Sequence, residues 1–424
     1  MPSITRPSAP DTVRPPPVIG RAGPSRSDRI GTINQLLDRA WHHGWLPRPL
    51  LEPDALIALA ERQTGLADAG PDTGWRARLD CLAEALHREA ALSPLGRTMA
   101  HGQLLAALAN RLRAHALWRK HREILERPIR APIIVMGQMR SGTTRMQRLL
   151  ACDPRLMFTR FFESWNPLPR SGRRGLIDDR IVRGWLGLRC ARFLDPQFDV
   201  IHPTSVTQAD EEIGLHSISI FGSAFEAQWR VPSFAARNEA EDTALIYREF
   251  KRLLQTIAWL RRDRGDRPWI LKLPQMTQDL DAVLAAFPDA RLVCLNRDAT
   301  RVVASSASLA HGQMRLQSDD IDRDWIGREW LRKAAHRQHR AASVRAQADV
   351  PQVDVAFGAM DRDWRAEMRR VYAQMAMPLT DEVEARMAAY VARSRGHGGG
   401  GHRYDLSDFG LTEHQVRETL GHRC

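Results

Sequence analysis

The chain has 424 residues, of which 43% are hydrophobic and 26% charged, and its 62 Lys and Arg outweigh 50 Asp and Glu to give a formal net charge of +12. These fractions are typical of a globular protein with a sizeable core, and they exclude the disordered, collagen-like and disulfide-rich classes. No apolar run approaches the ~18 residues of a membrane span, and the first residues lack the apolar stretch of a secretory signal. We therefore expect a cytoplasmic protein without a membrane span.

The cysteines and the basic charge exclude further classes of site. The five cysteines are scattered, with no CxxC pair and no Cys/His cluster at zinc spacing, so we expect reduced thiols and no metal centre. Positive charge is spread along the chain and alternates with acids, which argues against a nucleic-acid-binding stripe. A site for a small anionic ligand remains compatible with this composition.

The N-terminal third divides into a tail and a helical region. Residues 1–28 are rich in Pro, Arg, Ser and Gly and lack large apolar side chains, which predicts a disordered tail. From 29 to 127 the apolar residues recur with helical spacing, and no strand pattern interrupts them. The predicted helices cover residues 34–43, 54–63, 75–91 and 94–125.

The pattern changes at residue 128, where short apolar and β-branched runs begin to alternate with helical segments. The predicted strands cover residues 133–136, 156–161, 269–273, 291–295 and 353–357. Strands separated by helices indicate a parallel sheet covered on both faces. We therefore predict an α/β fold over 128–424, a P-loop-type parallel sheet flanked by helices, with an all-α region before it. Ligands of such sheets bind beyond the carboxyl ends of the strands.

The strongest motif follows the first predicted strand. The strand runs into the loop from Gly137 to Thr144 and then into a helix, an arrangement that aims backbone N–H groups and the helix dipole at a phosphate. A nucleoside-triphosphatase loop carries Lys directly after its second glycine. Here Thr143 follows Gly142, and the cation stands three positions earlier as Arg140. The motif therefore predicts phosphate binding without the lysine that ATP chemistry needs.

A second motif follows the fourth predicted strand. Arg297 stands at the carboxyl end of that strand, and Ser305 lies eight residues further along the helix that follows, about two turns away. An Arg fork and a Ser hydroxyl can grip one phosphate from two directions. Together with the first motif, this spacing predicts a second phosphate site.

These two motifs resemble those of the PAPS-dependent sulfotransferases, in particular the bacterial branch with a helical N-terminal extension. In that family the first loop holds the 5′-phosphate side of 3′-phosphoadenosine 5′-phosphosulfate (PAPS), and an Arg-Asp-Pro segment with Ser eight residues after the Arg holds the 3′-phosphate. The match is complete except at Ala299, where the family prefers Pro. The resemblance implies donor binding by Gln138, Met139, Arg140, Ser141, Gly142, Thr143, Thr144, Arg145, Arg297 and Ser305.

Further segments agree with the family, and two positions depart from it. Arg395 and Gly396 precede a glycine run, and by this resemblance we expect them to close over the 3′-phosphate. Many relatives carry His where this chain has Met276. Cytosolic relatives stack adenine on an aromatic residue where Arg145 stands here, so adenine would stack on the Arg plane or elsewhere.

The catalytic candidates follow from the needs of sulfuryl transfer, in which positioning and electrostatics dominate and no metal is obligatory. Arg140 and Lys272 are assigned to the developing charge. We assign the base to Glu163, which we expect at the end of the second strand and pointing into the same crevice, as in related carbohydrate sulfotransferases. His202 and Glu211 are the alternative bases.

Two other classes of function compete with this interpretation. A P-loop kinase or NTPase would share the sheet and the loop, but Thr143 in the lysine position argues against it. A basic nucleic-acid-binding protein would use the net charge, but no recognition motif is present. The acceptor stays open among a sugar, a lipid, a peptide and a small aromatic alcohol, because acceptor pockets are built from variable loops.

Overall fold

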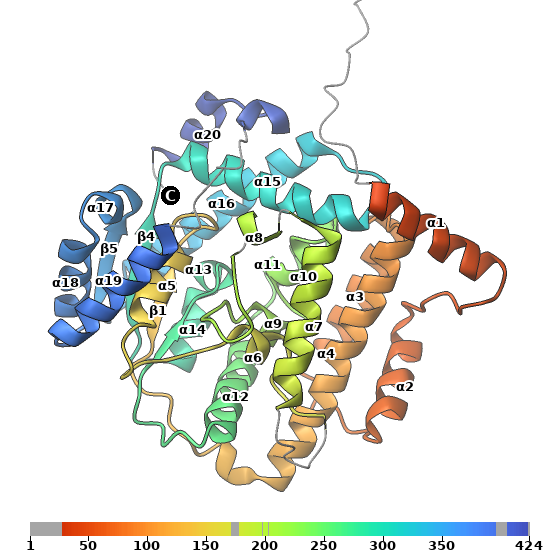
Figure 1. The fold of residues 1–424 in the computed structure, drawn as a ribbon, viewed down its shortest axis with the longest axis horizontal. Coiled ribbons are helices and arrows are strands. Elements are labelled where there is room, and N and C mark those ends of the chain that lie inside the picture. The colour runs from red at the N-terminus through yellow and green to blue at the C-terminus, as the bar shows by residue number, and fades with distance from the viewer. Residues whose placement is uncertain (1–27, 171–177, 197, 202, 396–404, 423–424) are drawn as a thin grey trace, which may run out of the picture.

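The computed structural model describes residues 28–170, 178–196, 198–201, 203–395 and 405–422 (Figure 1). The predicted tail over 1–28 lies outside these residues except for Asp28, which begins the first helix. Helices α1 (Asp28–His42), α2 (Pro53–Thr64), α3 (Trp75–Arg88) and α4 (Pro94–Lys120) and the 3-10 turn η1 (Arg122–Ile124) precede the sheet. These bounds confirm a helical N-terminal region.

The five strands and the remaining helices alternate, as the sequence predicts. The strands are β1 (Ile133–Met136), β2 (Met157–Phe158), β3 (Trp269–Leu271), β4 (Arg291–Asn296) and β5 (Gln352–Ala356). The other helices are α5 (Thr143–Leu150), α6 (Phe161–Trp165), α7 (Asp179–Leu194), α8 (Phe198–Ile201), α9 (Ile213–Ser217), α10 (Ser223–Glu226), α11 (Pro232–Ala240), α12 (Ala244–Leu260), α13 (Gln275–Gln278), α14 (Leu280–Ala286), α15 (Ala299–Gln317), α16 (Arg323–Arg345), α17 (Phe357–Arg362), α18 (Trp364–Gln374), α19 (Asp381–Arg395) and α20 (Glu413–Leu420), with the 3-10 turn η2 (Leu406–Phe409).

The strands form one parallel sheet in the order β2-β3-β1-β4-β5. Because all the strands run in one direction, the loops after β1, β3 and β4 leave from the same edge of the sheet. The second strand is shorter than predicted. It ends at Phe158, and α6 begins three residues later, at Phe161. This difference moves Glu163 from a strand end into a helix.

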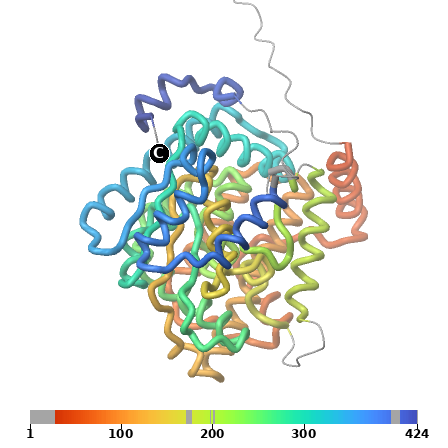
Figure 2. Tube along the Cα trace, turned by 60° about the vertical axis from the view of Figure 1, so that its left-hand side comes forward, coloured from red at the N-terminus to blue at the C-terminus, as the bar shows by residue number. Residues whose placement is uncertain are grey.

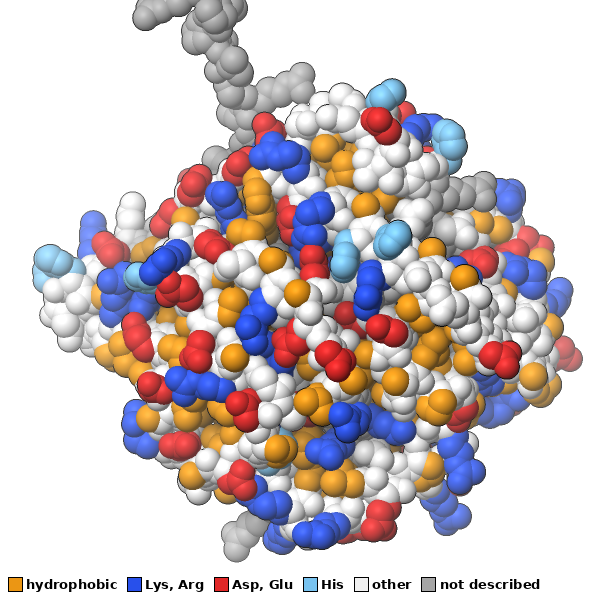
Figure 3. Space-filling view, turned by 180° about the vertical axis from the view of Figure 1, so that it is seen from behind, with side chains coloured by type: hydrophobic (Ala, Val, Ile, Leu, Met, Phe, Trp, Pro, Cys, Tyr) orange, Lys and Arg blue, Asp and Glu red, His pale blue; other side chains and the backbone are white. Residues whose placement is uncertain are grey.

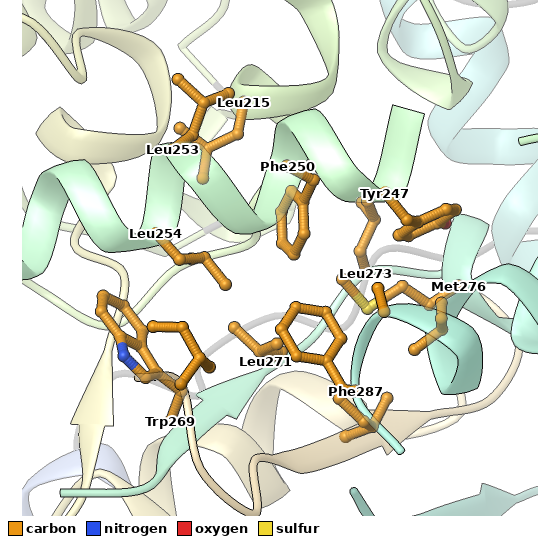
Figure 4. Close-up of a cluster of buried hydrophobic side chains, with 14 of the residues drawn as sticks. Leu215, Tyr247, Phe250, Leu253, Leu254, Trp269, Leu271, Leu273, Met276 and Phe287 are labelled. Atoms are coloured by element: carbon orange, nitrogen blue, oxygen red, sulfur yellow. The ribbon is translucent and has the colours of Figure 1, made fainter. Parts of the chain in front are cut away.

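Each face of the sheet has its own core, because successive side chains of a strand point to opposite sides. On β1, Ile134 and Met136 pack against a cluster that includes residues of α12 and α14. Ile133 and Val135 pack against α5, α18 and α19 on the other face. Figure 4 shows the first cluster, in which Phe250 of α12 lies near Phe287. The sheet is therefore covered on both faces, and the predicted α/β class is confirmed.

The N-terminal helices pack as a layer beside this sheet (Figure 1). Residues of α2, α3 and α4 share a core with Phe225, Trp229 and Phe234 from the α10–α11 region. The C-terminal part of α4 reaches the sheet's own core, where Trp118 Nε1 donates to Thr256 Oγ1 of α12 at 2.8 Å. The helical region thus supports the scaffold of the sheet, while the domain division at residue 128 stays a prediction.

Helix α15 continues from the end of β4 and packs under the C-terminal residues. Val303 and Ala304 of α15 share a small core with Val416 and Leu420 of α20, and Figure 2 shows α20 in dark blue above α15. None of the described helices is long and apolar enough to cross a membrane. On the face drawn in Figure 3, basic and acidic side chains alternate without a single-sign patch.

Candidate active site

The loop between β1 and α5 has a backbone that only glycine permits at two positions. Gly137 has φ 141° and Gly142 has φ 99°. A Cβ at Gly137 would lie 2.6 Å from the carbonyl oxygen of Leu295, and one at Gly142 would lie 2.7 Å from a ring carbon of Phe357. Arg140 also has a positive φ, 69°, and strain of this kind recurs at functional sites. Glycine at these two positions therefore lets the loop pass close to β4 and to Phe357, the residue after β5.

The loop ends on the first turn of α5, where the backbone N–H groups have no acceptor within the helix. Within the loop, the Ser141 N–H donates to the Gln138 carbonyl at 3.1 Å, and the Ser141 hydroxyl donates to the same oxygen at 2.7 Å. The Gln138 side chain donates to the Ala334 carbonyl of α16 at 2.8 Å. These hydrogen bonds hold the loop in a turn, and the N-terminus of α5 that follows it can bind an anion.

The structure brings the two sequence motifs together. Arg140 Nε donates to the Ser305 hydroxyl at 3.0 Å, and Arg297 Nη1 donates to the Arg140 carbonyl at 2.8 Å. The next residue of α15 also contacts the loop, since Ser306 Oγ donates to the Met139 carbonyl at 3.3 Å. Two segments that are far apart in the sequence thus form one basic, hydroxyl-bearing surface beyond β1 and β4.

Lys272 joins this surface from the end of β3. Its side chain is 1% exposed, and its Nζ donates to Thr144 Oγ1 at 3.0 Å and pairs with the Glu211 carboxylate. The Glu211 side chain is 21% exposed. A buried ammonium is costly unless it is paired, and the Glu211 carboxylate supplies that counter-charge beside the loop.

Glu212 fixes the backbone of the same lysine. The Lys272 N–H donates to Glu212 Oε2 at 2.8 Å, and Glu212 is 0% exposed. Burial raises the pKa of Glu212 to about 8, against the smaller opposing effects of its hydrogen bonds and of Lys272. Two adjacent acids therefore hold the side chain and the main chain of one lysine, and the second of them is largely neutral at pH 7.

The predicted position of Glu163 is wrong. Because β2 is short, Glu163 falls in the first turn of α6, where its Oε2 accepts from the Arg160 N–H at 2.9 Å. Its Oε1 accepts from Arg261 Nε at 2.7 Å, and the carboxylate is 0% exposed. Both of its oxygens are thus engaged beside the edge strand β2, whereas the acid that contacts Lys272 is Glu211.

An aromatic residue near the loop was missed by sequence reasoning. Phe357 directly follows β5, and the Arg297 guanidinium lies 4.0 Å from the centre of its ring. Its position at the carboxyl end of a strand was the signal that could have found it. Arg145, which stands where relatives have an aromatic, instead reaches α17 and donates to Asp361 at 2.5 Å and to the Met360 carbonyl at 3.0 Å.

The remaining candidates lie partly outside the described residues. His202 and Gly396 are outside them, and Arg395 is described only as the last residue of α19. Met276, which stands where relatives have His, is fully buried in the core beside Leu273. Within the described residues no group of three His, Cys, Asp or Glu could hold a metal ion.

Comparisons with known proteins agree with this geometry. The sequence profile of the sulfotransferase family matches residues 132–381. The crystal structure of sulfotransferase STF1 from Mycobacterium tuberculosis H37Rv superposes with a TM-score of 0.72 and 27% identity, covering 88% of this chain and 99% of that chain. Sulfotransferase STF9 from Mycobacterium avium superposes with a TM-score of 0.77 and 26% identity, covering 88% and 95%. No curated protein matches the sequence. The chain belongs to the sulfotransferase family.

Proposed function

We propose that the protein transfers a sulfuryl group from PAPS to a hydroxyl or amine of its acceptor. The observation that carries this proposal is the meeting of two anion-binding motifs, through the Arg140–Ser305 and Arg297–Arg140 hydrogen bonds. A donor with phosphate at both its 3′ and 5′ positions needs two such sites at a short separation. A nucleoside triphosphate would instead need the lysine that Thr143 replaces.

The donor's 5′-phosphosulfate would lie on the loop and the first turn of α5. Its 3′-phosphate would take the Arg297 fork and the Ser305 hydroxyl. Both of these groups bind loop atoms in the structure, so donor binding would exchange those contacts for contacts to phosphate. The ring of Phe357 and the guanidinium of Arg145 are flat surfaces near the loop on which adenine could stack, and Arg395 and Gly396 remain candidates to cover the 3′-phosphate.

In the transfer, the acceptor oxygen or nitrogen forms a bond to sulfur while the bond between sulfur and the 5′-phosphate oxygen breaks. The electron pair of that bond stays on the phosphate, where Arg140 and Lys272 would stabilise the charge. The acceptor proton needs a base. We assign that role to Glu211, because it is partly exposed and contacts Lys272, whereas Arg261 and the α6 turn occupy Glu163. His202 remains the alternative base.

The donor site is tested by comparing two nucleotides on two variants. Adenosine 3′,5′-bisphosphate and AMP differ only in the 3′-phosphate, and calorimetry gives the affinity of each. For Arg297→Ala we expect a loss of roughly 10- to 100-fold for the bisphosphate, because hydrogen bonds to charged groups contribute about 1.5–3 kcal/mol, and little change for AMP. Arg328→Ala, at an exposed position on α16, is the control.

Equal losses for both nucleotides would contradict the assignment of Arg297 to the 3′-phosphate. Failure of either nucleotide to bind the unmodified protein would contradict the proposed donor. Labelled PAPS with a panel of sugar, lipid, peptide and phenolic acceptors would then identify the acceptor class, which the donor site does not determine.

A further inference from the structure

A basic cleft lies beside the edge strand β2, and Glu163 forms part of its lining. It has a volume of about 420 Å³ and is bounded by residues of β2, α6, α7 and the end of α12. Its charged lining consists of Arg160, Arg180, Arg261, Arg267, Glu163 and Asp178. The donor loop, Lys272 and Arg297 do not contribute to it. The cleft is therefore separate from the candidate active site.

Three of the four arginines are neutralised by acids. Arg180 donates to both carboxylate oxygens of Asp178, with the shortest distance 2.6 Å. Arg261 pairs with Glu163, and Arg267 pairs with Asp263. These pairs account for both acids that face the cleft.

Arg160 is the exception. In the described part of the chain no carboxylate lies within ion-pair distance of its guanidinium, although the residue is only partly exposed. Burial, followed by the charge of Arg261, lowers the pKa of Arg160. The charge of Glu163 acts in the opposite direction, but that carboxylate is paired with Arg261. The cleft thus has a positive excess, and Arg160 is the lining arginine without an ion pair of its own among the described residues.

The rest of the lining is apolar. Phe158, Ile181 and Leu260, which are partly exposed, border the same cleft as Arg160. A ligand that fits both parts has an anionic head group and a hydrocarbon portion, because the guanidinium fork matches planar carboxylates and tetrahedral oxyanions and the apolar walls gain from burial.

We propose that this cleft binds an amphiphilic anion, a sulfate ester, phosphate ester or carboxylate with an attached hydrocarbon group, through Arg160. The site is independent of the proposed donor site. Its backbone is nevertheless connected to the segment of the proposed base: Phe161 N–H donates to Gln208 O at 3.1 Å, and Asp210 N–H donates to Thr159 O at 3.0 Å, directly before Glu211. A ligand on Arg160 would therefore contact the same two-stranded segment that positions Glu211.

The test is calorimetric titration with octyl sulfate, with octyl glucoside as the uncharged comparison. Adenosine 3′,5′-bisphosphate is present at saturation, so that octyl sulfate cannot bind at the two phosphate sites of the donor. We expect saturable binding of octyl sulfate at one site, at least tenfold weaker binding by Arg160→Gln, an intermediate affinity for Arg160→Lys, and no saturable binding of octyl glucoside. Arg192→Gln is the matched control, since Arg192 lies on α7, pairs with Asp199 and does not line the cleft.

A melting curve on each variant shows whether it is folded. Because Arg160 makes no ion pair in the described structure, Arg160→Gln should melt at the same temperature as the unmodified protein or higher. The proposal is overturned by any of three results: no saturable binding of octyl sulfate, equal binding by Arg160→Gln, or an equal loss in Arg192→Gln. Because binding is measured without turnover, these results do not depend on whether the protein transfers sulfuryl groups.

Discussion

Two buried acid–cation pairs in this protein use the same chemistry for different purposes. Glu163 and Arg261 lie beside the edge strand, where both carboxylate oxygens are engaged and Arg261 Nη2 also donates to the Phe158 carbonyl at 2.8 Å. Glu211 and Lys272 lie at the carboxyl end of β3, where the acid is partly exposed and the lysine contacts the loop through Thr144.

The difference lies in their position in the fold. An arginine that caps an edge strand satisfies backbone groups that would otherwise be unpaired. A lysine at the end of an inner strand lies where ligands of parallel sheets bind. A buried carboxylate therefore indicates a catalytic role only when its partner faces the ligand side of the sheet, and the following predictions test that distinction.

The largest effect is expected from Glu211→Gln. If Glu211 takes the acceptor proton, turnover should fall by about 10² to 10⁴, while the affinity for adenosine 3′,5′-bisphosphate stays within a few fold. Single-turnover kinetics with labelled donor and a responsive acceptor measure the effect. The acid limb of the pH profile of kcat/KM should also disappear. Glu84→Gln, at an exposed position on α3, is the control. Near-normal turnover of Glu211→Gln would move the base to another residue, either His202 or Glu163.

Lys272→Ala should come next, with a loss of turnover of about 10² to 10³ from missing charge stabilisation. Unlike Glu211→Gln, this variant should keep the acid limb of its pH profile, because the base is still present. The same single-turnover assay separates the two variants. Lys120→Ala, at the exposed end of α4, should behave like the unmodified protein. A Lys272→Ala variant with full turnover would contradict a catalytic role for this lysine.

Glu163→Gln should affect stability rather than chemistry. Removing the acid leaves Arg261 buried without its partner, and breaking such a pair typically costs about 3–5 kcal/mol of unfolding free energy. Urea denaturation followed by circular dichroism measures this loss. Turnover per folded molecule should stay within a few fold. A stable variant that has lost its turnover would restore Glu163 as the base and overturn the distinction between the two pairs.

The sequence predicted the sheet and the local structure of the two motifs well because both depend on local patterns. The residues around Gly137 and Gly142 combine a buried strand, a tight turn and a helix start within one short segment, and Arg297 and Ser305 share a single helix. Glu163 was misplaced because β2 is only two residues long, and its carboxylate both caps α6 and pairs with Arg261. Such a contact joins residues about 100 positions apart, so no local pattern reports it. The contacts of Glu211 with the Lys272 side chain and of Glu212 with its main-chain N–H are also long-range, so no local pattern predicts them.

The smallest effect is expected from Glu212→Gln. This variant compares the two neighbouring acids, Glu211 and Glu212, that contact Lys272. Burial raises the pKa of Glu212 to about 8, from an ordinary value near 4.5. Between these two values the folded protein binds more protons at Glu212 than the unfolded chain does, so this group makes the folded state less stable as pH rises across the window.

Glutamine cannot ionise, yet its side-chain oxygen can still accept from the Lys272 N–H. Turnover should therefore be nearly unchanged at pH 7. Stability relative to the unmodified protein should rise between pH 5 and 8 by at most about 1.4 kcal/mol per pH unit. Asp279, whose pKa burial raises to about 7, is present in both proteins, so its contribution cancels in the difference. Urea denaturation at several pH values gives this difference directly. Parallel stability curves for the two proteins would show that Glu212 is ionised in the folded state, and that its bond to Lys272 is made by a carboxylate.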